Sequence, residues 1–525
     1  MPEADPTQLP APESLPSLQS NRLATRILGA MSAQMATQGL RIVQQILLIP
    51  LFLNAWGIDV YTDWLLINAG VAFVSIFDGG MQPHFSGQLQ ERLVRGDRAG
   101  YRRAARIAGF NYLLVIAITA SFAIASRFVI DWRETLGVSA LRPHEFNLTL
   151  LLLGANAFIT LPFGVAGSLY RANAEYDRGV LVNFALIAIQ LILSLILLLL
   201  RQPITVLAMG TISASLFGWI AISIDQRVRY GPLPWGLVVP NAPELRTTVT
   251  QCLFFTAQPI TTWLTIQGPL LILGHLGIPG ATVAFTTART LVGVSRQVTL
   301  QLAYPFGFEL SLLMLRGDLI AFARLLESAV RIIGSIGGML AGLIMVAGLP
   351  LSVVWLQGRV TLQPSLIAAL AIPVAITAAS QVYQLVLLFA NRPRPIAGSV
   401  MIYAAVGLAL AGILAPFFGA VGVAVGLAIG ETIAMVGYLP SQIFRLVNIA
   451  GGAIQRTSML RAALATLISY SIARIAAVLI PPTGTLQLGI VGAIWAVVAG
   501  LSFYAVLLDP AQRAFVQKRL LHRAN

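Results

Sequence analysis

The chain has 525 residues, 57 % of them hydrophobic and only 10 % charged, with a formal net charge of +14. A soluble globular domain is about 25 % charged, so this composition excludes a soluble protein and indicates a membrane protein. The basic residues lie in short segments between long apolar runs, so the net charge predicts no nucleic-acid partner. A single cysteine excludes an intramolecular disulfide, and four scattered histidines give no pattern for a metal site.

The N-terminal residues 1–20 are rich in proline and weakly acidic, and we expect them to form a disordered cytoplasmic tail. The apolar runs that follow are long enough to cross a bilayer, which takes about 20 residues, and they must do so as helices. About fourteen transmembrane helices are predicted. Their approximate bounds are 27–55, 59–86, 107–126, 148–170, 180–200, 204–224, 252–275, 280–309, 332–356, 364–390, 396–417, 419–440, 462–481 and 485–508.

Basic residues are distributed unevenly between the two sides of this arrangement. The external loops carry five of the 34, namely Arg127, Arg133, Arg142, Arg201 and Arg359. Four more lie within predicted spans: Arg41, Arg289, Arg296 and Arg474. The others lie in the segments on the opposite side, which the positive-inside rule identifies as cytoplasmic. Both termini are therefore predicted to be cytoplasmic.

A short internal repeat indicates two related halves. The sequence RGDRAGYRR (95–103) recurs as RGDLIAFAR (316–324), each time between the second and third spans of a set of six. Both segments are expected to form amphipathic helices at the membrane surface. The resulting prediction is an all-α polytopic protein with two pseudo-symmetric six-helix lobes around a central cavity. Its parts are the N-lobe 21–224, a cytoplasmic linker 225–250, the C-lobe 251–440, and an appended helix pair with a cytoplasmic tail, 441–525.

Two spans carry arginines at helical spacing. Arg289 and Arg296 are seven residues apart in span eight and so share one face, with Gln297 beside them. Span one carries a similar stripe of Gln34, Gln38, Arg41 and Gln45. An arginine at bilayer depth costs about 2.5–3.5 kcal/mol, so it usually faces a wet cavity or a partner. These residues are our candidates for binding an anion, with the glutamines as hydrogen-bonding groups beside the arginines.

Two acidic residues in predicted spans have two interpretations each. Glu431 in span twelve either couples transport to an ion or forms a salt bridge with Arg296, a role for which Glu309 is the other candidate. Asp78 either takes part in ion coupling or ends a helix. Arg41 has a structural interpretation as well, as the partner of Asp63 or Asp78. Too few acids lie near Arg41, Arg289 and Arg296 to neutralise all three, which favours an anionic ligand.

Three segments resemble, in their order and topological placement, the multidrug/oligosaccharidyl-lipid/polysaccharide exporter superfamily, and within it the bacterial polysaccharide flippases of O-antigen or exopolysaccharide type. They are WGIDVYTDWLLINAGVAFVSIFDGGMQPHFSGQLQERLVRGD (56–97), YPFGFELSLLMLRGD (304–318) and FGAVGVAVGLAIGE (418–431). The resemblance covers roughly residues 25–440. It implies a cationic cavity with arginines in spans one and eight, where Arg41 and Arg289 stand. Arg296 is an additional or shifted arginine.

The resemblance implies a flippase, not an enzyme, that moves undecaprenyl-diphosphate-linked oligosaccharide from the cytoplasmic to the periplasmic leaflet of the bacterial inner membrane by alternating access. The cavity arginines would bind the pyrophosphate. No cofactor is expected, and the coupling ion, H⁺ or Na⁺, is left open. The expected partners are the lipid-linked glycan, membrane lipids and other polysaccharide assembly proteins, and we expect a monomer.

Two other functions fit parts of the sequence. A multidrug or cation antiporter of the same superfamily would want carboxylates in its cavity, whereas the intramembrane charges here are mostly positive. A membrane glycan polymerase or ligase usually needs a large external loop, and the longest one here spans about residues 129–147. Within that loop, Asp131 with Glu134 is a candidate pair for the external acids that a glycosyltransferase would need.

Overall fold

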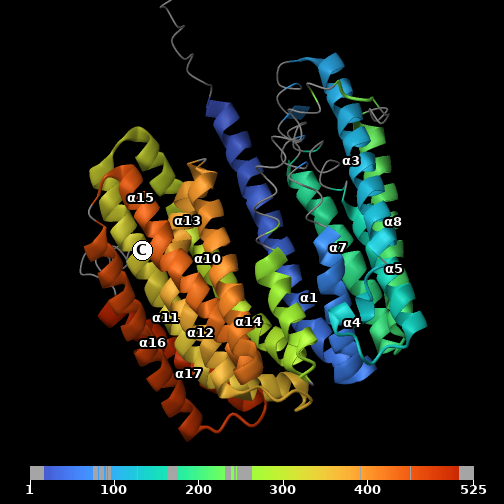
Figure 1. Cartoon of the computed structure of the whole chain (residues 1–525). Coiled ribbons are helices and arrows are strands. Elements are labelled where there is room, and N and C mark those ends of the chain that lie inside the picture. Colours follow the sequence, from blue (N-terminus) through green and yellow to red (C-terminus); the bar gives the residue numbers. More distant parts are fainter. Residues whose placement is uncertain are drawn as a thin grey trace, which may run out of the picture.

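The computed structural model describes residues 17–507, except 75–80, most of 82–95, and 127, 162, 164–169, 171–175, 231–237, 242–243, 245–259, 261–262, 279, 391 and 450. Side chains are described mostly from residue 36 onward. Every regular element in this part of the chain is a helix, which confirms the predicted all-α fold. Figure 1 shows two groups of helices with α1 between them.

The first group contains the helices of the predicted N-lobe. These are α1 (Ser17–Val71), α3 (Arg98–Ser126), α4 (Trp132–Leu136), α5 (Pro143–Thr160), α7 (Tyr176–Leu199) and α8 (Ile204–Tyr230). In Figure 1, α3, α5, α7 and α8 stand together in blue to green on one side of α1. The loop after α4 is tied to α1 through Asp63, whose carboxylate accepts backbone N–H groups from Ser139, Ala140 and Leu141 at 3.2, 2.8 and 2.8 Å.

The second group contains the C-lobe and the appended pair. Its helices are 263–275, α10 (Ala281–Arg316), α11 (Leu319–Leu356), α12 (Pro364–Thr377), α13 (Ser380–Phe389), α14 (Pro393–Thr432), η2 (Ile433–Tyr438), α15 (Leu439–Val447), α16 (Gly452–Leu479), α17 (Thr485–Ser502) and η3 (Phe503–Leu507). The segments η2 and η3 are π-helical. Helix α16 packs tightly on α11, since a Cβ on Gly338 would lie 2.3 Å from the carbonyl oxygen of Ala462.

Each of the fourteen predicted spans coincides with helix in the described residues, and the chain is a multi-pass membrane protein. By length and composition alone, eight described helices could cross a bilayer, or nine if the pair α12 and α13, bent by 55°, forms one span. The difference arises because α1 and α14 each contain two predicted spans, and because α5, α10 and the helix 263–275 are not among the eight.

Helix α1 doubles back at Gly57, where the backbone is not helical. Phe52 and Trp64 are twelve residues apart and would be separated by about 18 Å along a straight helix. Their ring centroids lie 6.0 Å apart, and those of Phe52 and Tyr61 lie 5.0 Å apart. These aromatic contacts therefore close a helical hairpin, and they gather Trp and Tyr at its tip, as is common at a membrane–water interface.

Helix α14 forms a second hairpin with its tip at Gly419. A Cβ on Gly422, Gly426 or Gly430 would lie 2.3–2.5 Å from backbone atoms of the preceding arm. Such contact is possible only for glycine, and small residues at this spacing let membrane helices approach closely. The glycine-rich run in the predicted span twelve thus serves close packing between the two arms.

The internal repeat has a structural counterpart. Gly96 and Gly317 have positive φ angles of 73° and 76°. The next residue in each copy, Asp97 or Asp318, accepts a backbone N–H from three residues further on, at 2.8 and 3.0 Å respectively. Three backbone hydrogen bonds around each turn also correspond at the predicted offset. The expected surface helices are not separate elements, however, because both segments continue directly into α3 and α11.

The two groups of helices meet at the end of the molecule that contains α4, which we call the α4 end. Arg359 Nη1 donates to the carbonyl of Leu53 at 3.2 Å, and Trp355 Nε1 donates to that of Ile46 at 2.7 Å. A Cβ on Gly274 would lie 2.5 Å from the Leu66 side chain. Under the predicted topology the α4 end is external, so these contacts would close the external side of the interface between the two lobes.

Gly137 offers a direct test of this closure. Its φ is 74°, and a Cβ there would lie 2.4 Å from the Gly274 carbonyl oxygen on the other group. Gly137→Ala is therefore expected to force the lobes apart, so that a cysteine placed at the buried Leu66 in a Cys252→Ser background reacts severalfold faster with a water-soluble thiol reagent. Gly96→Ala is the matched control, because φ there is 73° and nothing lies within 4 Å. Equal labelling rates in both variants would contradict this account of the closure.

Candidate substrate-binding seam

Helix α10 carries the two arginines that the sequence singled out. It is interrupted by neither Gly293 nor Pro305, so Arg289 and Arg296 remain two helical turns apart on one face, about 10.5 Å along the axis. The surrounding side chains come from helices far apart in the sequence. Each arginine has a different environment, which determines what it can bind.

Arg296 forms a two-bonded ion pair with Glu431 on α14. Its Nη2 donates to Glu431 Oε2 at 2.8 Å, and its Nη1 donates to Oε1. The hydroxyl of Thr377, at the end of α12, lies 3.0 Å from Glu431 Oε1 and 2.8 Å from the carbonyl oxygen of Pro373, so its one proton is shared between the two acceptors. The side chain of Glu431 is only 7 % exposed, whereas that of Arg296 is 36 % exposed. The pair is thus buried on its acidic side and accessible on its basic side.

Arg289 has no acidic partner among the described residues. Its Nη1 donates to the carbonyl of Ile266 at 2.7 Å, and its guanidinium lies 5.5 Å from the centre of the Phe285 ring, one turn earlier on the same helix. A carbonyl and an aromatic face both accept a cation without neutralising it. Arg289 therefore keeps its full positive charge.

Tyr403 on α14 lies near both arginines, close enough to interact electrostatically with Arg289, Arg296 and Glu431. We refer to Arg289, Arg296, Thr377, Tyr403 and Glu431 as the α10–α14 cluster. The cluster contains two guanidinium groups and one carboxylate, so it carries a net positive charge.

Helix α1 presents its polar stripe to α10. Gln38 Nε2 donates to Gln297 Oε1 at 3.1 Å, which identifies the side of α1 that faces α10. Arg41 and Gln45 follow Gln38 by three and seven residues and so lie on the same side. Both are exposed, and no described side chain or backbone group is bonded to either. We call the facing sides of α1 and α10 the seam.

The seam brings Arg41 and Arg296 to the same level. The α1 hairpin turns at Gly57, and α10 begins at Gly280, beside Ile58, so the first arm of α1 and helix α10 run antiparallel from the α4 end. Arg41 and Arg296 each lie sixteen residues from these starting points, about 24 Å along the helix axes. One ligand between α1 and α10 could therefore contact both guanidinium groups.

The side chains of the seam and the cluster are chemically suited to an anion that carries hydroxyl groups. Arginine offers a planar fork of donors that matches two oxygens of a phosphate and stays charged at every physiological pH. The glutamine side chains supply both donors and acceptors, which suits sugar hydroxyls. Three arginines are offset by one carboxylate among these side chains, so an anion would be drawn to the seam.

The structure places the remaining predicted site residues as follows. Asp78 lies outside the described residues, and so does the side chain of Gln34, whose backbone is in α1. Asp63 is bonded to the loop after α4, so it is not the partner of Arg41. Glu431, and not the exposed Glu309, is the partner of Arg296. Whether Glu431 also couples an ion stays a prediction.

Two members of the cluster were not found from the sequence. Thr377 lies at the break between α12 and α13, and an interrupted span, here with Pro373, is a known pointer to binding sites in transporters. That signal could have identified it. Tyr403 stands alone in an apolar span, with no spacing that links it to a partner, so only the folded chain brings it to the arginines.

Asp131, one of the two acids considered for a catalytic role in the external loop, has a structural role. Asp131 is the N-cap of α4, and its carboxylate accepts the backbone N–H groups of Arg133 and Glu134 at 2.9 and 3.3 Å. An N-cap of this kind stabilises a helix by about 1 kcal/mol.

In the part of the chain that the structure describes, no group of three His, Cys, Asp or Glu residues could hold a metal ion.

Comparison with known proteins places the fold. No protein-family model and no curated protein matches the chain. Among solved structures, the lipid II flippase MurJ in an inward closed conformation matches with a TM-score of 0.70 at 10 % identity, covering 91 % of this chain and 100 % of its own. A multidrug resistance MATE family transporter of the MOP superfamily, inward-facing, matches with a TM-score of 0.65 at 15 % identity, covering 79 % and 96 %.

The chain shares the fold of these two transporters. This confirms, at the level of fold, the resemblance on which the sequence prediction rested. An outward-facing MATE family transporter matches with a lower TM-score, 0.55, at 14 % identity and coverages of 82 % and 96 %.

Proposed function

We propose that this protein translocates a prenyl-diphosphate-linked oligosaccharide, of the undecaprenyl type, from the cytoplasmic to the periplasmic leaflet of the bacterial inner membrane. The observation that carries the proposal is the positive seam between the lobes, where Arg41 and Arg296 lie at one level and Arg289 has no acidic partner among the described residues. The fold supports it, because MurJ, which has a similar structure, is a lipid II flippase. The seam lies where repeat-built transporters bind substrate.

The chemistry required is binding and release. The pyrophosphate would be held by guanidinium forks, the sugars by the glutamines of α1 and α10, and the prenyl chain would remain in lipid. A membrane potential of 100 mV, negative inside, favours outward movement of each negative charge by about 2.3 kcal/mol. A coupling ion, H⁺ or Na⁺, is therefore optional on energetic grounds, and Glu431 is our candidate for the group that would bind it.

The proposal predicts that loss of the protein causes one lipid-linked glycan to accumulate. Lipid extracts of a deletion strain would be compared by mass spectrometry with those of strains carrying wild type, Arg289→Ala, or Arg41→Ala with Arg289→Ala. We expect wild type to clear the accumulated lipid and the double variant to fail, because it lacks two of the three phosphate-binding forks. Protein amounts in the membrane are measured in parallel.

Unchanged lipid-linked pools in every strain would contradict the proposal. A matched control is Arg474→Ala on α16, which removes an exposed intramembrane arginine away from the seam. This variant should clear the glycan as wild type does. The identity of the accumulated lipid then names the glycan, and the same extract shows whether the chain acts on O-antigen, exopolysaccharide or another lipid-linked sugar.

Export of cationic drugs is less well supported. The MATE family neighbours are described as multidrug resistance transporters, so the fold is compatible with that function. A cation site needs a carboxylate free to bind it. Within the described seam and cluster, the one carboxylate is Glu431, and it is held by Arg296 and Thr377.

A further inference from the structure

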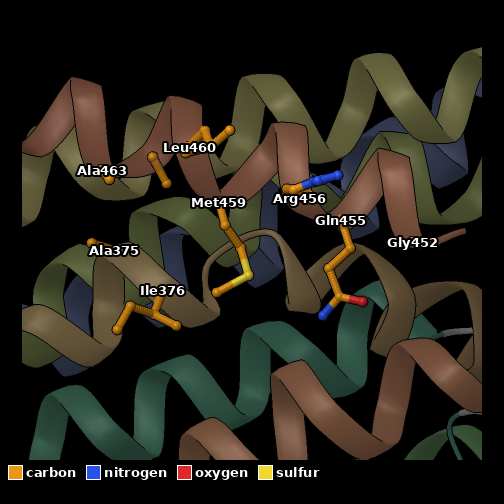
Figure 2. Close-up of a pocket in the computed structure, with 9 residues that line it drawn as sticks. Ala375, Ile376, Gly452, Gln455, Arg456, Met459, Leu460 and Ala463 are labelled. Carbon is orange, nitrogen blue, oxygen red and sulfur yellow. The ribbon is translucent and has the colours of Figure 1, made fainter.

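A second site lies outside the seam, between α12 and the start of α16. It is a pocket of about 540 Å³, a size typical of small-molecule sites. Ala375 and Ile376 form one wall, and Met459 and Leu460 form the other. Figure 2 shows Met459 extending from α16 towards the wall that carries Ile376. Almost all of the lining is hydrocarbon, so the pocket accepts an apolar chain.

The pocket opens towards the bilayer. Leu460 is 64 % exposed, and the outer face of α16 continues with Leu464 and Leu467, which are 44 % and 64 % exposed. In a membrane protein such apolar exposure is contact with lipid tails. Hydrocarbon from the bilayer can therefore enter the pocket without crossing water.

One end of the pocket is polar and positive. Gln455 and Arg456 line it from the first two turns of α16 (Figure 2). Arg456 is exposed, and no described acidic group pairs with it. The surrounding sequence offers none either, since residues 432–508 contain four arginines and no Asp or Glu. An apolar cleft with an unneutralised arginine at its mouth matches a ligand with a hydrocarbon chain and an anionic head.

The walls of the pocket also hold the α10–α14 cluster in place. Ile376 precedes Thr377, which donates to Glu431. On the other wall, Gln455 donates to the carbonyl of Val436 in η2, the π-helix that begins two residues after Glu431. A ligand between these walls would therefore stabilise both segments that position Glu431.

We propose that this pocket binds an anionic phospholipid of the bilayer, with one acyl chain between α12 and α16 and the phosphate at Arg456. The lipid is a resident ligand and is not the transported substrate, so the inference does not depend on the proposed function. Basic pockets between membrane helices on the cytoplasmic side are a recurrent way of holding anionic headgroups. Arg456 lies on that side under the predicted topology.

The test uses the purified full-length chain and native mass spectrometry with phosphatidylglycerol or phosphatidylcholine. Wild type should retain one phosphatidylglycerol more tightly than phosphatidylcholine. Arg456→Gln should weaken that binding about fivefold, the effect of one basic residue on an anionic lipid. Ala463→Trp, which fills the pocket from an exposed position, should abolish it. The bound lipid should also raise the thermal midpoint of wild type but not that of either variant.

The matched control is Arg445→Gln. Arg445 is an exposed arginine in the last turn of α15, seven residues before α16 begins, and it does not line the pocket. Its loss should leave phosphatidylglycerol binding within twofold of wild type. Equal losses in Arg445→Gln and Arg456→Gln would show general attraction to charge and overturn the proposal. So would equal binding of phosphatidylcholine, or stoichiometric displacement of the lipid by a prenyl diphosphate, which would assign the pocket to the transported substrate.

Discussion

Arg296→Gln is expected to lower the free energy of unfolding by about 3–5 kcal/mol, the usual effect of leaving a buried charge without its partner. Glu431 would keep only the Thr377 hydroxyl, and its side chain is 7 % exposed. The reciprocal change, Glu431→Gln, should lower the free energy of unfolding by less, because Arg296 is 36 % exposed and can remain solvated. Denaturant or thermal unfolding in detergent measures both.

The double variant Arg296→Gln with Glu431→Gln separates stability from transport. Two neutral amides at these positions can hydrogen-bond to each other, so the double variant should be more stable than Arg296→Gln alone. A double-mutant cycle gives the coupling energy between the two positions. If the double variant loses as much free energy of unfolding as the two single variants together, the ion pair does not have the structural role that its geometry indicates.

Transport by Glu431→Gln distinguishes the two roles of this carboxylate. As a counter-ion only, Glu431 competes with the substrate for Arg296, and its neutralisation should leave clearance of the lipid-linked glycan intact or increase it. As an ion-coupling group, it must gain and lose a proton or a cation, and glutamine should abolish clearance in a stably folded protein. Arg296→Gln should fail in both cases, so it provides the reference for lost function.

The sequence predicted the parts of this molecule that depend on local patterns. Apolar length identified the helices, and the repeat at Gly96 and Gly317 located equivalent turns in the two halves. The turns at Gly57 and Gly419 lie at boundaries between predicted spans, at 55/59 and 417/419. Each of these features is determined by neighbours within a few residues, so a single sequence contains enough information.

The pairing of the charged groups was harder to predict. Arg296 and Glu431 are 135 residues apart, and the sequence offered Glu309 as an equally plausible partner. The cost of an unpaired charge in lipid required some carboxylate, but only the packing of α14 against α10 decides which one. Asp63 shows the same limit, since its three backbone partners follow α4 and have no side-chain signature.

Arg41→Glu is expected to abolish clearance of the lipid-linked glycan without destabilising the protein. Arg41 is exposed and has no described partner, and substitutions at such positions usually change the free energy of unfolding by less than about 0.5 kcal/mol. A charge-assisted hydrogen bond contributes about 1.5–3 kcal/mol, so Arg41→Gln should reduce transport about 10- to 100-fold. Glutamate adds repulsion of the pyrophosphate and should reduce it further.

Arg41→Lys tests the geometry of the contact. Lysine keeps the charge but loses the planar fork, so we expect transport between that of wild type and Arg41→Gln. Arg474→Glu on α16 makes the same charge reversal outside the seam and should transport normally. Wild-type transport by Arg41→Glu would show that α1 does not contact the phosphate. Because Arg41 and Arg296 lie at one level on facing helices, the substrate site would then have to be confined to the C-lobe.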